Sequence, residues 1–277
     1  MKLDLYDNIW GIFVIFKREF LFNLKSIRMV ILMIIFTLLV LLTVFGSYMA
    51  MGMSSDTVGP ELSELMIKQG PVFILSAIVT MVILFGPLIP LALSFDTIVK
   101  EKNQNSIGLL LCRPVGKRSI AIGKFLGIIG ALSLPIILVN TIAIIVIMIL
   151  SGKGIAFNQA GGFILYTLIF LAIYASLGQL ISSVVKTTTT AILLGIVLWI
   201  FLPAIVQIIG MYISNISSQI ALFNPSTPYS TCISHALGTF NESSSQAVPL
   251  WAYYISFILW LIIPLFLAIE IFHRKED

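Results

Sequence analysis

Charged residues are scarce in this sequence. Lys, Arg, Asp and Glu make up 10% of the 277 residues, whereas apolar residues make up 59% and the mean hydropathy is +1.08. Soluble domains carry about a quarter charged residues, so this composition excludes an ordinary soluble domain and indicates an integral membrane protein. The net charge of +4 is expected to reflect the orientation of such a protein rather than nucleic-acid binding.

Metal ligands and catalytic motifs are also few. The sequence has two cysteines, Cys112 and Cys232, and two histidines, His235 and His273; none of them belongs to a metal-binding or disulfide framework. Cys232 and His235 lie three residues apart, but two ligands alone are weak evidence for a metal site. The sequence has no H-E-x-x-H and no G-x-S-x-G motif, which argues against an intramembrane enzyme.

The sequence also lacks an energy-transducing site. The pairs Gly116-Lys117 and Gly123-Lys124 do not have the upstream Gly and following Ser or Thr of a P-loop. The carboxylates Asp96 and Glu270 lie at the ends of apolar runs rather than inside them. Because a carboxylate in mid-membrane costs roughly 2.5–3.5 kcal/mol and marks ion-coupled transporters, coupling to a proton or sodium gradient is disfavoured. Energy for any work must then come from another chain.

Long apolar runs dominate the rest of the chain. A membrane-spanning helix needs about 20 predominantly apolar residues, and six runs reach this length. We therefore predict an all-α polytopic membrane protein with six transmembrane helices in a single domain, 1–277. The predicted spans are residues 29–50, 71–95, 125–150, 160–185, 191–213 and 250–272.

Basic residues indicate the orientation of these spans. If the N-terminus is cytoplasmic, fourteen of the sixteen Lys and Arg residues lie on the cytoplasmic side, and only Lys68 and Lys153 lie outside. Cytoplasmic loops carry an excess of Lys and Arg, so we predict a cell-membrane protein with both termini in the cytoplasm. The segment 214–249 then forms an outer loop, which could cover a path or meet an extracytoplasmic partner.

Residues 7–25 precede the first span and are too polar to cross a bilayer. Their apolar residues recur at helical spacing, at Ile9, Phe13, Phe16, Phe20 and Leu24. We predict an amphipathic helix that lies in the membrane interface; the alternative is the start of one long first helix. The residues assigned to this interfacial helix are Trp10, Lys17, Arg18 and Glu19.

Prolines interrupt several predicted spans. Pro87 and Pro90 lie in the span 71–95, and Pro203 lies in the span 191–213. Each proline removes a helix hydrogen bond, so a kink is expected at these sites. Polar residues inside spans, such as Gln207, more often join helices than line a path.

The charged segment 96–124 lies between the second and third predicted spans and holds six of the sixteen Lys and Arg residues. We predict a helix over residues 96–112, whose polar residues face solvent or a partner, and a turn over 113–116, where Pro114 breaks the helix. The alternative is an ordinary solvated loop.

A specific pattern runs through this segment. It consists of Asp96-x4-Glu101, Ile107-Gly-Leu-Leu-Leu111, Arg113-Pro114, Lys117-Arg118 and Gly123-Lys124. This pattern resembles the cytoplasmic signature of ABC-2 type transporter permeases, most closely their NosY-like branch. Ser106-Ile107 and Lys102 depart from it, where Gly-Thr and Arg or Asp are common. Leu222-Phe-Asn-Pro225 with Tyr229 is similar to an outer-loop segment of the same branch.

The resemblance implies the membrane half of an ABC transporter with a type V exporter-like fold. Two copies would pair, and each would hold a separate cytoplasmic ATPase subunit that carries ATP and Mg, while this chain would be non-catalytic and hold no cofactor. Residues 7–25 would correspond to the elbow helix, and 96–124 would contain the coupling helix between spans 2 and 3. Spans 2 and 5 would line the central path.

The resemblance also assigns roles to individual residues. The expected ATPase-coupling residues are Asp96, Lys100, Glu101, Lys102, Asn103, Arg113, Pro114, Lys117 and Arg118. The expected path or hinge residues are Pro87, Pro90, Pro203 and Gln207. Two functions remain open: export or transfer of a substrate, or a membrane scaffold that passes ATPase motion to an extracytoplasmic partner, as in the metal-cofactor maturation associated with the NosY-like branch.

Overall fold

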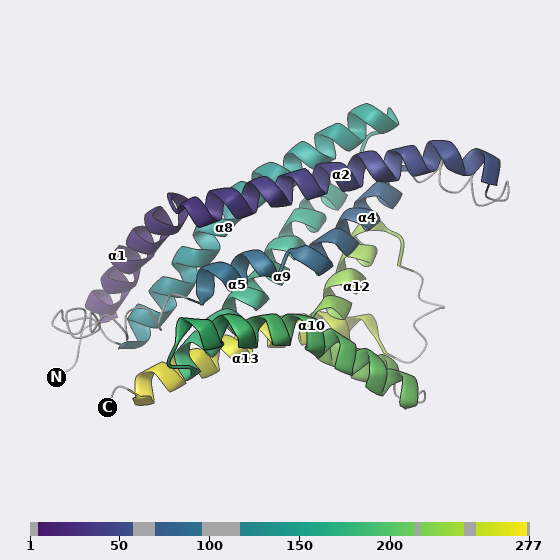
Figure 1. Ribbon diagram of the computed structural model, residues 1–277. Helices are drawn as coiled ribbons and strands as arrows, with labels where there is room; N and C mark the ends of the chain where they lie inside the picture. Colours follow the sequence, from purple (N-terminus) through teal and green to yellow (C-terminus); the bar gives the residue numbers. More distant parts are fainter. Residues whose placement is uncertain (1–4, 58–69, 96–116, 214–216, 241–247, 276–277) are drawn as a thin grey trace.

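Helices form all of the regular secondary structure in the parts of the chain that the computed structural model describes (Figure 1). These parts are residues 5–57, 70–95, 117–213, 217–240 and 248–275. The helices are α1 (Leu5–Leu24), α2 (Ile27–Thr57), α4 (Gly70–Phe85), α5 (Leu88–Ser94), α8 (Lys117–Ser151), α9 (Phe157–Val184), α10 (Thr188–Tyr212), α11 (Ser217–Ile220), the 3-10 helix η2 (Ala221–Phe223), α12 (Ser226–Leu237) and α13 (Leu250–Lys275).

Six helical segments are long and apolar enough to cross a membrane. α2, α8, α9, α10 and α13 each provide one, and α4 and α5 together provide another. A helix satisfies its backbone hydrogen bonds internally, which is why such sequences cross hydrocarbon as helices. The predicted fold class, an all-α polytopic membrane protein with six transmembrane helices, is confirmed.

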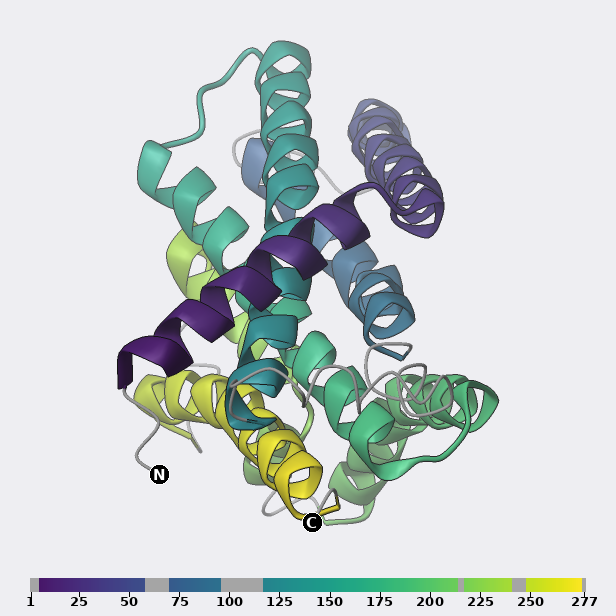
Figure 2. The ribbon, with the colours of Figure 1, turned by 90° about the vertical axis from the view of Figure 1, so that its left-hand side faces the viewer.

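α1 is a helix separate from α2. α1 ends at Leu24, the Ser26 amide donates a hydrogen bond to the Asn23 carbonyl at 3.1 Å, and α2 begins at Ile27. Figure 2 shows α1 lying across the end of the bundle, in front of α8, on the side where both chain termini lie. The first two helices therefore differ in direction.

The segment predicted as the span 71–95 is interrupted at Gly86-Pro87. α4 ends at Phe85, and the Gly86 amide still donates to the Val82 carbonyl at 2.8 Å. A Cβ at position 86 would collide with that carbonyl oxygen, so glycine permits the close approach at the break. Pro87 has no amide hydrogen and caps α5, while Pro90 lies buried inside α5.

α9 forms the centre of the bundle. α13, α5, α12 and α8 pack around it. Phe170 and Tyr174 of α9 are buried, and the Phe170 ring stacks on Tyr229 of α12 with ring centroids 4.2 Å apart. The Thr167 and Tyr229 hydroxyls lie 3.1 Å apart and are hydrogen-bonded. The core thus joins α9 to a helix outside the six spans.

That helix, α12, lies within the segment 214–249, which was predicted as an outer loop. Tyr229, Cys232 and Ile233 of α12 are buried in the core. Just before α12, the Leu222 carbonyl accepts hydrogen bonds from Ser256 Oγ at 2.8 Å and Trp260 Nε1 at 3.1 Å. These two residues lie ~9–15 Å along α13 from its start at Leu250. Residues 222–237 therefore fold back into the bundle.

The polar composition of α12 concealed this helix in the sequence. Its hydroxyls donate to backbone carbonyls one turn earlier in the same helix: Ser230 to Thr227 at 2.9 Å and Ser234 to Ser230 at 2.7 Å. Hydroxyls bonded in this way can be buried without an external partner. Gly238, with φ of 73°, then ends the helix in the left-handed conformation.

Candidate functional site

Several ionisable side chains gather at the end of the bundle where α8 begins and α13 ends. We call this region the charged end and define it by Glu19, Arg118, Lys124, Glu270 and Arg274. Figure 2 views the molecule from this side, with α1 crossing in front of α8 and the end of α13 close to the C-terminus. Lys153, by contrast, follows the opposite end of α8.

Residues 117–124 of the charged segment lie at the charged end, and the rest of that segment lies outside the described residues. This holds for Asp96, Lys100, Glu101, Lys102, Asn103, Arg113 and Pro114. Lys117 is the first residue of α8, and Arg118 follows it. The structure does describe the residues that flank 96–116 on both sides and the helices that contact them.

Phe95, at the end of α5, is held by α9 and α10. It is buried, and its carbonyl oxygen accepts a hydrogen bond from Ser182 Oγ at 3.1 Å. Its ring lies against Gly195 of α10, where a Cβ would collide with it. A Cβ on Gly178 of α9 would likewise lie 2.6 Å from the Ser94 Cβ. Small residues at both positions let the helices approach closely.

The start of α8 is held by α13 and α9. Arg118 Nη2 lies 3.4 Å from Glu270 Oε2, and the other oxygen of Glu270 accepts a hydrogen bond from Arg274 Nε at 2.9 Å. One turn further along α8, the Ala121 carbonyl accepts a hydrogen bond from Gln179 Nε2 at 2.9 Å. Gln179 is fully buried. The Arg118–Glu270 contact is exposed to solvent and contributes little, so the Gln179 bond is the firmer attachment.

α1 packs against the same part of α8 through a face of glycines. A Cβ at Gly123, Gly127 or Gly130 would lie within 3 Å of an α1 side-chain atom; at Gly127 it would be 2.5 Å from the Glu19 Cβ. Lys124 Nζ lies 3.9 Å from Glu19 Oε1, and both side chains are nearly buried, at 3% and 10% exposure. The glycines therefore bring the carboxylate of α1 close to a buried lysine of α8.

The residues assigned to the interfacial helix separate into two groups. Trp10 is 64% exposed, and Lys17 and Arg18 are also exposed. Glu19 instead faces α8, together with Asn23, whose side-chain amide donates to the Glu19 carbonyl at 3.0 Å. One face of α1 thus packs on the bundle and leaves Trp10 on the outside.

Comparison with known proteins identifies the family. The model of the ABC-2 family transporter protein matches residues 13–276. This chain belongs to the ABC-2 transporter family. It is also similar to the "Probable ABC transporter permease protein NosY" of Stutzerimonas stutzeri, with 23% identity over 208 residues, which cover 68% of this chain and 75% of that protein. The resemblance inferred from residues 96–124 is confirmed, and the chain is an ABC-2 family permease.

The expected hinge residues of this permease lie in contrasting surroundings. Pro87 and Pro90 are buried at the break between α4 and α5. Pro203 lies inside α10, which is bent in Figure 1, and Gln207 is exposed. The structure describes every residue of α10, and only two of them, Ala191 and Gly195, are buried. Most of this helix therefore has no packing partner within one copy of the permease.

Sequence reasoning missed the residues that hold the permease together at its charged end. Gln179 and Ser182 bind backbone carbonyls far away in the sequence, and no local pattern marks such contacts. The face of α8 that meets α1 did carry a signal: Gly123, Gly127 and Gly130 recur at helical spacing, which is typical of close helix packing in membranes.

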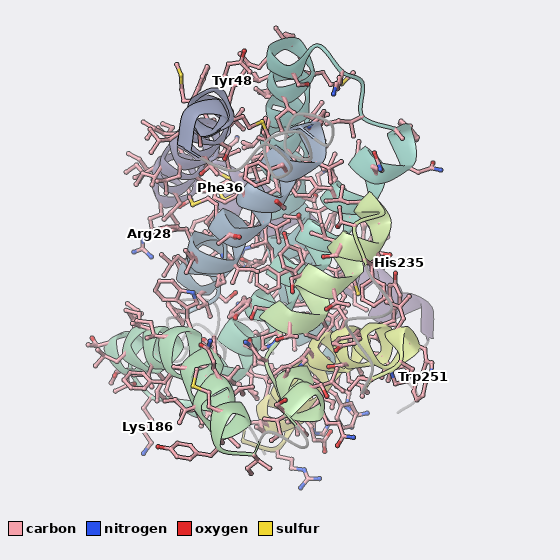
Figure 3. The ribbon with its side chains drawn as sticks, turned by 90° about the vertical axis from the view of Figure 1, so that its right-hand side faces the viewer. Arg28, Phe36, Tyr48, Lys186, His235 and Trp251 are labelled. Atoms are coloured by element: carbon pink, nitrogen blue, oxygen red, sulfur yellow. The ribbon has the colours of Figure 1, made fainter. Side chains whose placement is uncertain are left out.

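Cys232 and His235 lie in different surroundings in the permease. Cys232 is fully buried, and burial raises the pKa of its thiol to about 12, which disfavours the thiolate that a metal needs. His235 lies exposed on α12 (Figure 3), and its Nδ1 is 3.0 Å from the Tyr254 hydroxyl. Within the described ranges, no three His, Cys, Asp or Glu side chains come together as metal ligands.

Proposed function

We propose that this permease forms a homodimer and couples ATP hydrolysis on a separate ATPase subunit to the export or transfer of a substrate. In this proposal the charged end is cytoplasmic, and residues 96–116 contain the helix that meets the ATPase. α1 is the elbow helix, with Trp10 at the lipid interface and Lys17 and Arg18 facing the headgroups. The ATPase binds ATP and Mg; this chain binds neither.

One observation supports the proposal: Phe95, just before 96–116, and Ala121, near the start of α8 after it, both accept hydrogen bonds from one turn of α9. Ser182 binds the carbonyl of Phe95, and Gln179, three residues earlier, binds the carbonyl of Ala121. Residues three apart lie on one face of a helix. A push on 96–116 would therefore act on α9, the central helix, and through Phe95 on α10.

The proposal of a second copy rests on α10. Its exposed side chains include Leu193, Val197, Ile200 and Phe201, which are 47–58% exposed. α10 also carries Pro203, so the same helix can form the dimer contact and bend beside a central path. α4 and α5, with their break at Pro87, would line the other side of that path.

Charge reversal in the coupling segment tests this function. The permease is co-expressed with a candidate ABC ATPase, and the complex is reconstituted in lipid. We expect Glu101→Lys with Lys102→Glu to weaken ATPase binding and the stimulated ATPase rate at least ~tenfold, because like charges placed in contact cost several kcal/mol. Lys68→Glu, on the opposite side, is the matched control. Unchanged stimulation in a folded double variant would contradict the coupling role.

A second candidate function is force transmission without transport. It is favoured by the attachment of α12 to α9 along much of its length: Thr167 binds Tyr229, and Gln159 Nε2 binds the Leu237 carbonyl at 3.0 Å. Motion of α9 would thus reach the segment that meets an extracytoplasmic partner. A reconstituted complex that hydrolyses ATP, moves no solute and changes the affinity of a partner for 214–249 would favour this candidate.

A further inference from the structure

An open groove of about 500 Å³ runs between α8 and α9, beside the connection that joins them. Its α8 wall includes Thr141, Ile145 and Met148, and its α9 wall includes Phe157, Gly161 and Leu165. It lies away from the charged end. Figures 2 and 3 both show the α8–α9 connection on the opposite side of the molecule from α10.

Gly161 leaves space in the α9 wall of this groove. A Cβ at this position would have no atom within 4 Å, so a larger side chain here would extend into open space. The α8 residues at 141, 145 and 148 share one helix face. The Thr141 hydroxyl donates to the Ile137 carbonyl at 2.7 Å, so its proton is already bonded within the helix and the wall is essentially apolar.

The length of the groove matches one leaflet of a bilayer. It follows α9 from Phe157 to Leu168, a distance of ~16 Å at 1.5 Å per residue. The hydrocarbon core is about 30 Å thick, so one leaflet provides about 15 Å. A water molecule in the groove would find almost no hydrogen-bond partner. An acyl chain makes no hydrogen bonds and therefore loses none when it enters the groove. The dimensions and the apolar walls therefore fit a lipid tail.

A cationic residue lies in the connection between α8 and α9, next to the residues that line the groove. Lys153 carries the only charge in the connection between α8 and α9, and it is exposed. Ile155 and Phe157, two and four residues later, already line the groove. A lysine at the membrane surface attracts anionic phosphates, and its place just before the apolar lining residues matches the order of headgroup and tail in a phospholipid.

We propose that the groove between α8 and α9 binds one phospholipid, with an acyl chain over Gly161 and the phosphate beside Lys153. The lipid would brace the two helices at the end remote from the charged end. A second copy of the chain is a poorer occupant, because the helix face that most lacks a partner is α10, and a copy bound there leaves the groove facing lipid.

Filling the groove tests the proposal. Gly161→Leu places a side chain into open space, and Gly46→Leu on α2 is the matched control, since a Cβ there also has no atom within 4 Å. The full chain is purified in mild detergent and analysed by native mass spectrometry. We expect one retained phospholipid in the wild type and in Gly46→Leu, and loss of that adduct in Gly161→Leu.

Three results would overturn the acyl-chain site. They are retention of the same lipid by Gly161→Leu, absence of a retained lipid in the wild type, and a change of oligomeric state in Gly161→Leu alone. The last result would show instead that the groove is a protein contact. Because the measurement requires neither an ATPase nor a substrate, it is independent of the proposed function.

A second variant tests the headgroup contact. We expect Lys153→Glu to reduce the preference of the retained site for phosphatidylglycerol over phosphatidylethanolamine about fivefold, since a basic residue near the surface contributes about 1 kcal/mol toward an anionic lipid. The preference is measured by exchange with vesicles of the two lipids in equal amounts. An unchanged preference would overturn the role of Lys153.

Discussion

At the scale of residues, the Glu19–Lys124 contact is the ion pair of the described structure with the least solvent exposure. Its side chains are 10% and 3% exposed, and Nζ and Oε1 are 3.9 Å apart. Removing one partner of a buried pair costs about 3–5 kcal/mol, because the remaining charge then lies buried without an opposite charge or water to stabilise it. The long separation places this contact at the lower end of that range.

We therefore expect Glu19→Gln to lower the free energy of unfolding by about 3 kcal/mol. The measurement is a denaturant titration of the purified chain in detergent micelles. Glu270→Gln is the matched control: its partner Arg118 is 61% exposed and Arg274 is 78% exposed, so its midpoint should not move measurably. Equal shifts of the unfolding midpoint in the two variants would show that the burial of Glu19 does not determine how much its ion pair stabilises the protein.

At the scale of elements, α1 packs closely against α8 because the α8 residues at the contact are glycines without side chains. Gly127 is the tightest point, since a Cβ there would lie 2.5 Å from the Glu19 Cβ. The obstructing atom belongs to the stiff base of a side chain, so the collision can be relieved only if one helix moves. The position of α1 across the end of the bundle thus depends on the missing methyl groups of the three glycines, and most on that of Gly127.

We expect Gly127→Ala to loosen α1 from the bundle while the spans remain folded. Overpacking of this kind costs about 1–3 kcal/mol, which corresponds to roughly 5- to 150-fold faster amide exchange over Leu5–Leu24. Hydrogen–deuterium exchange by mass spectrometry measures this. Gly161→Ala, where a Cβ has open space, should leave α1 unchanged. Wild-type exchange rates in Gly127→Ala would contradict the fitted contact.

The elements differ in how far the sequence predicted them. The break between α4 and α5 was predictable because Pro87 lacks an amide hydrogen wherever it stands. α12 was not, because Ser230 and Ser234 look like solvated loop residues until their hydroxyls bind carbonyls of their own helix. A polar composition indicates a loop only when its polar groups need water as a hydrogen-bond partner.

At the scale of the whole molecule, the ends of the bundle differ in charge. The connection between α9 and α10 contains Lys186 and lies at the charged end, whereas Lys153 lies at the other end. Because basic residues favour the cytoplasmic side, this arrangement supports cytoplasmic termini.

Accessibility of single cysteines tests the orientation. In a chain carrying Cys112→Ser and Cys232→Ala, we expect Lys153→Cys to react with a membrane-impermeant maleimide in intact cells. Lys186→Cys should react only after the membrane is opened. The reverse pattern would contradict the proposed orientation, and labelling is quantified by the mass shift of the purified chain.

The six spans were predictable from the whole sequence because hydrocarbon admits few alternatives to a continuous apolar helix. The attachments at the charged end were not. Phe95 meets Gly195 and Gln179 meets Ala121 only after the spans have packed, and such partners depend on tertiary geometry rather than on local spacing. The segment 96–124 was recognisable by its charge and by its resemblance to the family, but the helix that bonds to Phe95 and Ala121 was not.

The attachment of Phe95 and Ala121 to one turn of α9 has a consequence for how such permeases diversify. A segment whose two ends are fixed side by side can be lengthened or replaced at small entropic cost, since doubling a loop adds only about 0.6 kcal/mol. If residues 96–116 meet the ATPase as proposed, this segment could therefore change its length or sequence while the helices keep their packing. The choice of ATPase could then evolve independently of the membrane path.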